Sequence, residues 1–144
     1  MLGTPQLDAF VSRSFTAIVT TVRQDGSPSS SMVSYARDGD RLYFSTTTAR
    51  LKGRTLQRDP RLALCVINDQ EPNGYVSVEG TVVIHRANPQ ALHERMFQYW
   101  DAFGDQYPKS PLRMLGREAI AALLVRPGRA IFEVMPTRVS GVLL

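Results

Sequence analysis

The chain has 144 residues, of which 43% are hydrophobic and 21% are charged. A chain of this length can bury about two thirds of the surface that it exposes when unfolded. It therefore needs neither a disulfide nor a metal to hold a core. Its one cysteine, Cys65, excludes a disulfide framework and a cysteine-based metal cluster. No run of about 18 apolar residues predicts a membrane span, and the N-terminus lacks the pattern of a secretory signal. We therefore expect a single cytoplasmic domain over residues 1–144, with no membrane partner.

The charge balance favours an anionic ligand without identifying it. The formal net charge is +4, and Lys52 and Lys109 are the only lysines among 17 basic residues. The planar guanidinium of arginine matches phosphate and carboxylate groups, so the excess of arginine over lysine favours an anionic ligand. An organism whose proteins are generally rich in arginine would show the same excess. We do not expect nucleic acid as the partner, because the aromatic residues do not interleave with the arginines to form a stacking platform.

The first half of the chain predicts one short helix followed by an antiparallel meander. Thr4-Pro5 is typical of a helix start, because threonine caps the first turn and proline fits its first position. Two Asp-Gly turns, within residues 24–27 and 37–40, separate runs rich in β-branched and aromatic residues, which is typical of hairpins. The expected elements are a helix over 5–13 and strands over 15–23, 28–36 and 41–45.

The second half mixes helices and strands. Asp59-Pro60 ends a helix, because the residue before proline avoids helical backbone, and Gly80 predicts a bulge or bend in a long strand. The expected elements are helices within 49–58, 88–104 and 110–124, and strands over 62–68, 75–86, 130–135 and 139–144. Six or seven antiparallel strands predict a mainly β fold, a small closed barrel with short helices at its ends, because closure removes exposed strand edges.

A ligand site is predicted within residues 43–60. A strand runs into three threonines and then into a helix whose first turns carry Arg50, Lys52 and Arg54. Free N–H groups at a helix start favour an anion, and threonine hydroxyls and cations add charge-assisted hydrogen bonds. The segment therefore predicts a phosphate site. A second interpretation remains open, in which Thr48 merely caps the helix and the arginines form a solvated face.

Several segments follow one another in a recognisable order. The hairpin strand PSSSMVSY is followed by FST, ARLK, LQRDPRLAL and YVSVEGTV. This order resembles the flavin and deazaflavin split-barrel family, the pyridoxamine 5′-phosphate oxidase-like superfamily. In that family a Ser/Thr at a strand end precedes a basic residue, a lysine two places on, an Asn-Leu pair and Asp-Pro. The corresponding positions here are Ser45-Thr46, Arg50, Lys52, Thr55-Leu56 and Asp59-Pro60. Thr55 replaces the usual asparagine, and Met32 stands where the family often has proline.

The resemblance implies an FMN-binding type of split β-barrel with six to seven antiparallel strands. It also implies a homodimer with cofactor sites at the subunit interface. Lys52 and Arg50 would hold the cofactor phosphate. Three further groups would complete the site: Ser45, Thr46 and Thr47 along the ribityl chain and ring edge, Ser31, Met32 and Val33 beneath the ring, and Tyr75 and Ser77 from the partner subunit.

The resemblance implies either F420 or FMN as the cofactor. F420 carries a phosphate and a polyglutamate tail, and four arginines beside Lys52 suit this longer anion: Arg50, Arg54, Arg58 and Arg61. The segment ARLKGRTLQRDPRLAL is also similar to the F420-dependent branch. We therefore expect an F420H2-dependent reductase that transfers a hydride to a small, conjugated organic acceptor. The alternatives are an FMN-dependent oxidoreductase or oxidase of the same fold, and a non-catalytic F420- or FMN-binding protein.

The sequence assigns no catalytic residue and no metal site. No acid–base pair stands out, and hydride chemistry belongs to the cofactor. The two histidines, His85 and His93, are expected at the surface or in packing, because further metal ligands are missing from the sequence pattern. Trp100 is expected in the core.

Overall fold

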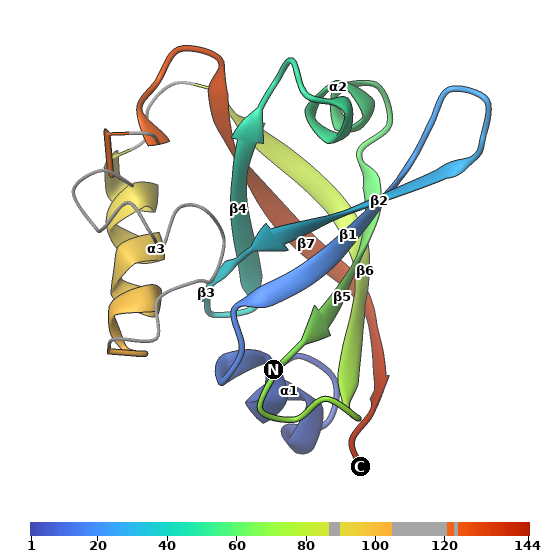
Figure 1. Ribbon diagram of the computed structural model, residues 1–144, viewed down its shortest axis with the longest axis vertical. Helices are drawn as coiled ribbons and strands as arrows, with labels where there is room; N and C mark the ends of the chain where they lie inside the picture. The colour runs from blue at the N-terminus through green and yellow to red at the C-terminus, as the bar shows by residue number, and fades with distance from the viewer. Residues whose placement is uncertain (87–89, 105–120, 123) are drawn as a thin grey trace.

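In a computed structural model that describes residues 1–86, 90–104, 121–122 and 124–144, the chain forms one curled antiparallel sheet (Figure 1). The strand order is β2-β1-β5-β6-β7-β4-β3. The strands are β1 (Thr16–Val22), β2 (Pro28–Ser34), β3 (Ala36–Asp38), β4 (Arg41–Thr47), β5 (Arg61–Ile67), β6 (Tyr75–His85) and β7 (Arg129–Val142). The helices whose bounds fall within these residues are α1 (Pro5–Ser12), α2 (Leu51–Arg58) and α3 (Gln90–Asp101). The expectation of a mainly β fold with short helices is confirmed.

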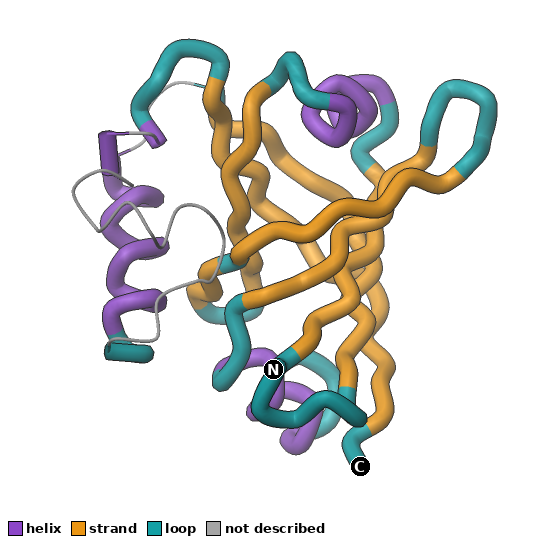
Figure 2. The backbone as a smooth tube through the Cα atoms, in the orientation of Figure 1, coloured by secondary structure: helices purple, strands orange, loops and turns teal. Residues whose placement is uncertain are grey.

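The barrel is split, because its two edge strands are consecutive in the chain but lie at opposite ends of the strand order. β2 pairs with β1, and β3 pairs with β4. The chain changes partner at the buried residue Tyr35, so the single strand expected over 28–36 is in fact two. The sheet is therefore a half-barrel whose strands wrap around one interior, rather than a fully closed barrel (Figure 2). The expected split β-barrel of six to seven antiparallel strands is confirmed.

β7 is one continuous strand where the sequence suggests two, over 130–135 and 139–144. Pro136 suggests a break, but it pairs with Gly80 of β6 next to a β-bulge of β7. The pairing shifts at this point, so Thr137 is the extra residue of the ladder. A bulge tolerates proline because no ladder N–H is required there. The irregularity predicted at Gly80 is confirmed, although the extra residue lies in the partner strand β7.

Inward-facing side chains of the strands fill the half-barrel. Phe44 of β4 and Phe132 of β7 are fully buried and stack with their ring centroids 5.3 Å apart. The helices α1 and α2 close opposite ends of the interior (Figure 1). Phe10 and Val11 of α1 and Leu56 of α2 belong to the same buried cluster as these two rings. The core thus fixes α2 against the end of the barrel.

α3 packs outside the half-barrel, in a second buried cluster with Tyr43 of β4 and Ile131 of β7. Trp100 of α3 is 2% exposed, and its indole N–H donates to the Tyr35 carbonyl oxygen at 2.8 Å. Its expected place in the core is confirmed. The helix expected over 110–124 falls mostly outside the described residues. Within the described ranges, no helix combines the length and apolarity that crossing a membrane requires.

Two tyrosine hydroxyls bind the C-terminal end of α1. The Tyr35 hydroxyl donates to the Val11 carbonyl oxygen at 2.7 Å. The Tyr99 hydroxyl of α3 lies 2.9 Å from the same oxygen and also reaches the Ser14 carbonyl. The last carbonyls of a helix have no donor within the helix, so these side chains satisfy them. The contacts join α1, α3 and the corner between β2 and β3.

Candidate functional site

The end of β4 presents its polar residues on two different faces. Thr46 is 3% exposed and points, like Phe44, into the half-barrel, because alternate residues of a strand share a face. Ser45 and Thr47 lie on the outer face, where Thr47 pairs with Arg129 of β7. The structure therefore brings Ser45 and Thr47 together and turns the Thr46 side chain away from them.

The loop between β4 and α2 is held by Thr47 rather than by a helix cap at Thr48. Arg50 is the N-cap residue of α2 and supplies no capping side chain. Its backbone N–H donates to the Thr47 hydroxyl at 3.2 Å. The Thr48 hydroxyl instead donates to the Gly128 carbonyl oxygen at 3.3 Å, just before β7. The interpretation of Thr48 as a cap is therefore wrong, and the first N–H groups of α2 have no side-chain cap.

Gly53 allows α2 to lie directly against this loop. A Cβ at this position would be 2.2 Å from the Thr47 carbonyl oxygen, so no residue larger than glycine fits without movement of the backbone. The Gln57 side chain adds a second attachment, since its amide donates to the Thr48 carbonyl oxygen at 3.0 Å. The resemblance does not assign Gly53 a role. The sequence does hold a signal for this contact, because a glycine inside a short helix-forming segment often marks a place where two backbones approach closely.

Three basic residues form a cation cluster at this point: Arg50, Lys52 and Arg129. Burial lowers the pKa of Lys52, and the charges of Arg50 and Arg129 lower it further. Burial also lowers the pKa of Arg129, with smaller contributions from Arg50 and Arg126. No ion pair among the described residues includes a member of the cation cluster. Lys52 and Arg129 are half-buried and Arg50 is exposed, and such a group of mutually repelling cations is suited to an anion.

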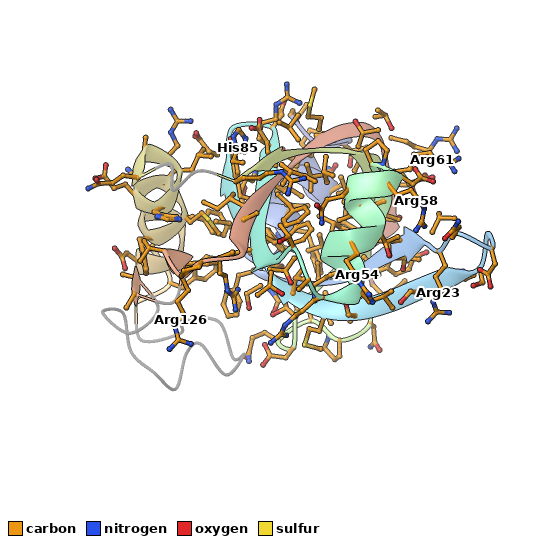
Figure 3. The ribbon with its side chains drawn as sticks, turned by 90° about the horizontal axis from the view of Figure 1, so that it is seen from above. Arg23, Arg54, Arg58, Arg61, His85 and Arg126 are labelled. Carbon is orange, nitrogen blue, oxygen red and sulfur yellow. The ribbon has the colours of Figure 1, made fainter. Side chains whose placement is uncertain are left out.

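The other arginines expected beside Lys52 are spread along α2 and into the start of β5 (Figure 3). Arg54 is exposed. The Arg58 guanidinium donates to the Val22 carbonyl oxygen at 2.8 Å, and Arg61 forms an ion pair with Asp59 at 2.8 Å. Of the four arginines expected beside Lys52, Arg50 alone therefore contributes to the cation cluster.

A second set of predicted residues lies on the outer face of the sheet. The register places Met32 of β2, Ile18 of β1, Cys65 of β5 and Ser77 of β6 in one row across four strands. Met32 is 61% exposed and Tyr75, two residues before Ser77, is 41% exposed. An open groove of about 480 Å³ borders this face, lined by Met32 and by aromatic and polar side chains that include Phe15, Phe103 and Asn68.

The remaining predicted residues face inward. Val33 of β2 is buried in the core, and Ser31 shares its face by alternation. Within one chain, the predicted site residues thus fall into three groups: Ser45, Thr47, Arg50 and Lys52 near α2, Met32, Tyr75 and Ser77 on the outer face, and Ser31, Val33 and Thr46 facing the interior.

The two histidines lie where the sequence analysis expects them. His85 Nε2 and Glu133 Oε1 are 2.8 Å apart across β6 and β7. His93 is 8% exposed, and burial lowers the pKa of its imidazole. No group of three or more histidine, cysteine or acidic side chains in the described part of the chain could hold a metal ion.

The family model described as pyridoxamine 5′-phosphate oxidase matches residues 4–143 of the chain. No curated protein matches this chain. Among solved structures, one described as an F420 reductase is 27% identical, with a TM-score of 0.65, and the match covers 92% of this chain and 94% of that one.

Two further solved structures show the same fold at lower identity. A conserved hypothetical protein, Rv2991 from Mycobacterium tuberculosis, is 21% identical with a TM-score of 0.74 over 99% of this chain and 86% of that one. A heme-binding protein from Mycobacterium smegmatis is 17% identical with a TM-score of 0.70, covering 95% of this chain and 52% of that one. The fold is thus shared by proteins with different ligands.

Proposed function

Because the chain belongs to the pyridoxamine 5′-phosphate oxidase family, we propose that it is an oxidoreductase that uses the deazaflavin F420 to reduce a small, conjugated organic acceptor. The observation that carries this proposal is the half-buried Lys52, which lies near the charges of Arg50 and Arg129. The Arg50 N–H contacts the Thr47 hydroxyl and the Arg129 guanidinium contacts the Ser45 hydroxyl. No carboxylate in the described residues forms an ion pair with Lys52 or Arg50. The likeness to an F420 reductase at 27% identity favours F420 over other cofactors.

The side chains at the end of β4 fit a phosphate-bearing cofactor. In this proposal, Lys52 and Arg50 bind the phosphate, while the hydroxyls of Ser45 and Thr47 donate hydrogen bonds to the cofactor chain. Thr46 contributes through its backbone, since its side chain points into the core. F420, when bound, supplies the hydride, and the protein positions the ring and excludes water around it.

We propose further that the outer face of the sheet forms a homodimer interface. Tyr75 of β6 and Val142 of β7 are exposed hydrophobic residues that pair with each other across the ladder. Met32, also exposed, lies on the edge strand β2 of the same sheet. Covering such a face with a second copy removes apolar surface from water. In the dimer, Tyr75 and Ser77 reach the cofactor site of the partner, and Ser31, Met32 and Val33 form the strand beneath the ring.

FMN is the second candidate, and a particular observation favours it. Arg58 and Arg61 already bind a backbone carbonyl and a carboxylate of their own chain, so fewer cations remain for a long polyanionic tail. A cofactor with one phosphate and no such tail needs only the residues around Lys52. The same oxidoreductase scaffold would then serve a flavin.

A side-by-side calorimetric titration of the purified chain with F420 and with FMN tests the proposal. Tight binding of F420 together with weak binding of FMN supports the deazaflavin assignment and is followed by a screen of acceptors with reduced F420. The reverse order of affinities moves the protein to the flavin branch. If neither cofactor binds, the proposed function is wrong.

Replacing Tyr75 by alanine is expected to reduce turnover and weaken the dimer while the secondary structure stays intact. The side chain is 41% exposed in one chain, so its loss removes little from the core. Sedimentation velocity over a dilution series reports the dimer, and far-ultraviolet circular dichroism reports the fold. Tyr75→Phe is the matched control, because it keeps the ring. A monomeric wild-type protein at micromolar concentration would rule out the shared site.

A further inference from the structure

Arg129 reaches the candidate site from the far end of the chain. It is the first residue of β7 and pairs with Thr47 across the ladder. Its Nη1 atom lies 3.4 Å from both the carbonyl oxygen and the hydroxyl oxygen of Ser45. The β4–β7 pairing therefore places a guanidinium on the same outer face as the two residues that line the predicted cofactor chain.

The Arg129 guanidinium is only partly satisfied by the protein. Its Nε atom is buried and has no hydrogen-bond partner, and both contacts to Ser45 are long. A buried donor on a charged group is costly when it is left unpaired, so such groups in native proteins usually have a ligand, an ion or a water as partner. Burial and the nearby Arg50 also lower the pKa of Arg129, and no carboxylate of the described residues forms an ion pair with it.

We propose that Arg129 binds the same anionic group as Lys52, and that this group is a phosphate ester. The inference rests on the proposed function. A lysine supplies a compact charge and an arginine supplies a planar fork, so the two together hold a tetrahedral anion from different directions. The ester is a monoester in FMN and a diester in F420, and the two chemistries share the phosphate oxygens that these cations bind.

A small cavity next to Arg129 offers an alternative, in which Arg129 binds an anion other than the one that Lys52 binds. It has a volume of about 160 Å³ and is lined by His85, Arg86, Arg126 and Arg129. Figure 3 shows Arg126 on the side of α3, away from the arginines of α2. If Arg129 served a different anion in this cavity, its contribution to cofactor binding would be independent of Lys52. A double-mutant cycle separates the two arrangements.

The experiment uses the full chain and whichever of F420 and FMN the wild type binds. The variants are Arg129→Gln, Lys52→Met, the double variant and Arg23→Gln, a control that removes an exposed charge from the β1–β2 turn region. Calorimetry is expected to show about tenfold weaker binding for Arg129→Gln and no change for Arg23→Gln. The loss in the double variant should differ from the product of the single losses by more than about twofold.

Each other outcome overturns the inference in a distinct way. Arg129→Gln binding as tightly as Arg23→Gln, while Lys52→Met binds weakly, refutes the role of Arg129 and leaves the proposed function standing. If the loss of cofactor affinity in the double variant equals the product of the two single losses, the two cations bind different groups. A wild type that binds neither cofactor refutes the proposed function and this inference with it. If Arg129→Gln does not fold, Arg129→Lys is used, and the thermal shift with inorganic phosphate should then be smaller than in the wild type.

Discussion

Lys52→Ala is expected to weaken cofactor binding by about 1.5–3 kcal/mol, roughly ten- to a hundredfold in Kd, because a charged hydrogen bond to phosphate is lost. The side chain is half-buried next to Arg50 and Arg129, so little water replaces the lost charge. Lys52→Met is the matched variant, since it keeps the aliphatic chain and removes only the ammonium group. Isothermal titration calorimetry with F420 and FMN measures the effect.

Removing the Lys52 charge should not destabilise the unliganded protein, in contrast to its effect on cofactor binding. The pKa of Lys52 is below its ordinary value, so the charged form is less favourable in the folded than in the unfolded chain. Lys52→Met should therefore leave Tm unchanged or raise it. In the wild type, the unliganded fold gains stability as pH rises above the folded pKa of Lys52, while cofactor affinity falls as the ammonium loses its proton. Affinity that stays the same in Lys52→Met would remove this residue from the phosphate site.

Gly53→Ala is expected to lower the free energy of unfolding by about 1–3 kcal/mol, even though alanine is intrinsically the better helix former by about 1 kcal/mol. The new Cβ would lie 2.2 Å from the Thr47 carbonyl oxygen and 3.1 Å from the Thr48 Cα, so it meets rigid backbone. Either α2 or the loop must move. Because that loop carries Thr47 and precedes Arg50, cofactor affinity should fall as well.

Urea unfolding of the unliganded protein measures the stability change, and calorimetry measures the affinity. Arg54→Ala is the control, because it introduces the same residue at the next, exposed position of α2. It should change stability by less than about 0.5 kcal/mol. If Gly53→Ala is as stable as the wild type or more stable, helix propensity outweighs the contact and the close approach has no structural importance.

Local sequence signals predict the parts of the fold that depend on neighbouring residues. The two Asp-Gly turns have glycines with φ of +88° at Gly26 and +58° at Gly39, and both lie between paired strands. The break at Tyr35 and the continuity of β7 through Pro136 depend instead on pairing with distant strands. Those partners are not visible in a local pattern.

The same distinction applies to the candidate site. Ser45, Thr47, Arg50 and Lys52 belong to one short segment, so a motif can bring them together. Arg129 joins them only through the β4–β7 ladder, 84 residues from Ser45, and no local pattern marks it. The opposite direction of Thr46 could have been predicted, because two neighbouring residues of a strand never share a face.

The tyrosine contacts at the end of α1 have a consequence for how the protein opens. Tyr99 of α3 and Tyr35 at the corner after β2 both reach the Val11 carbonyl oxygen, so the first helix is attached to segments that follow it by 24 and 88 residues. Loss of either helix leaves a buried hydroxyl or carbonyl without its partner. The amide protons of α1 and α3 should therefore exchange with solvent in one cooperative event rather than by separate fraying of the two helices.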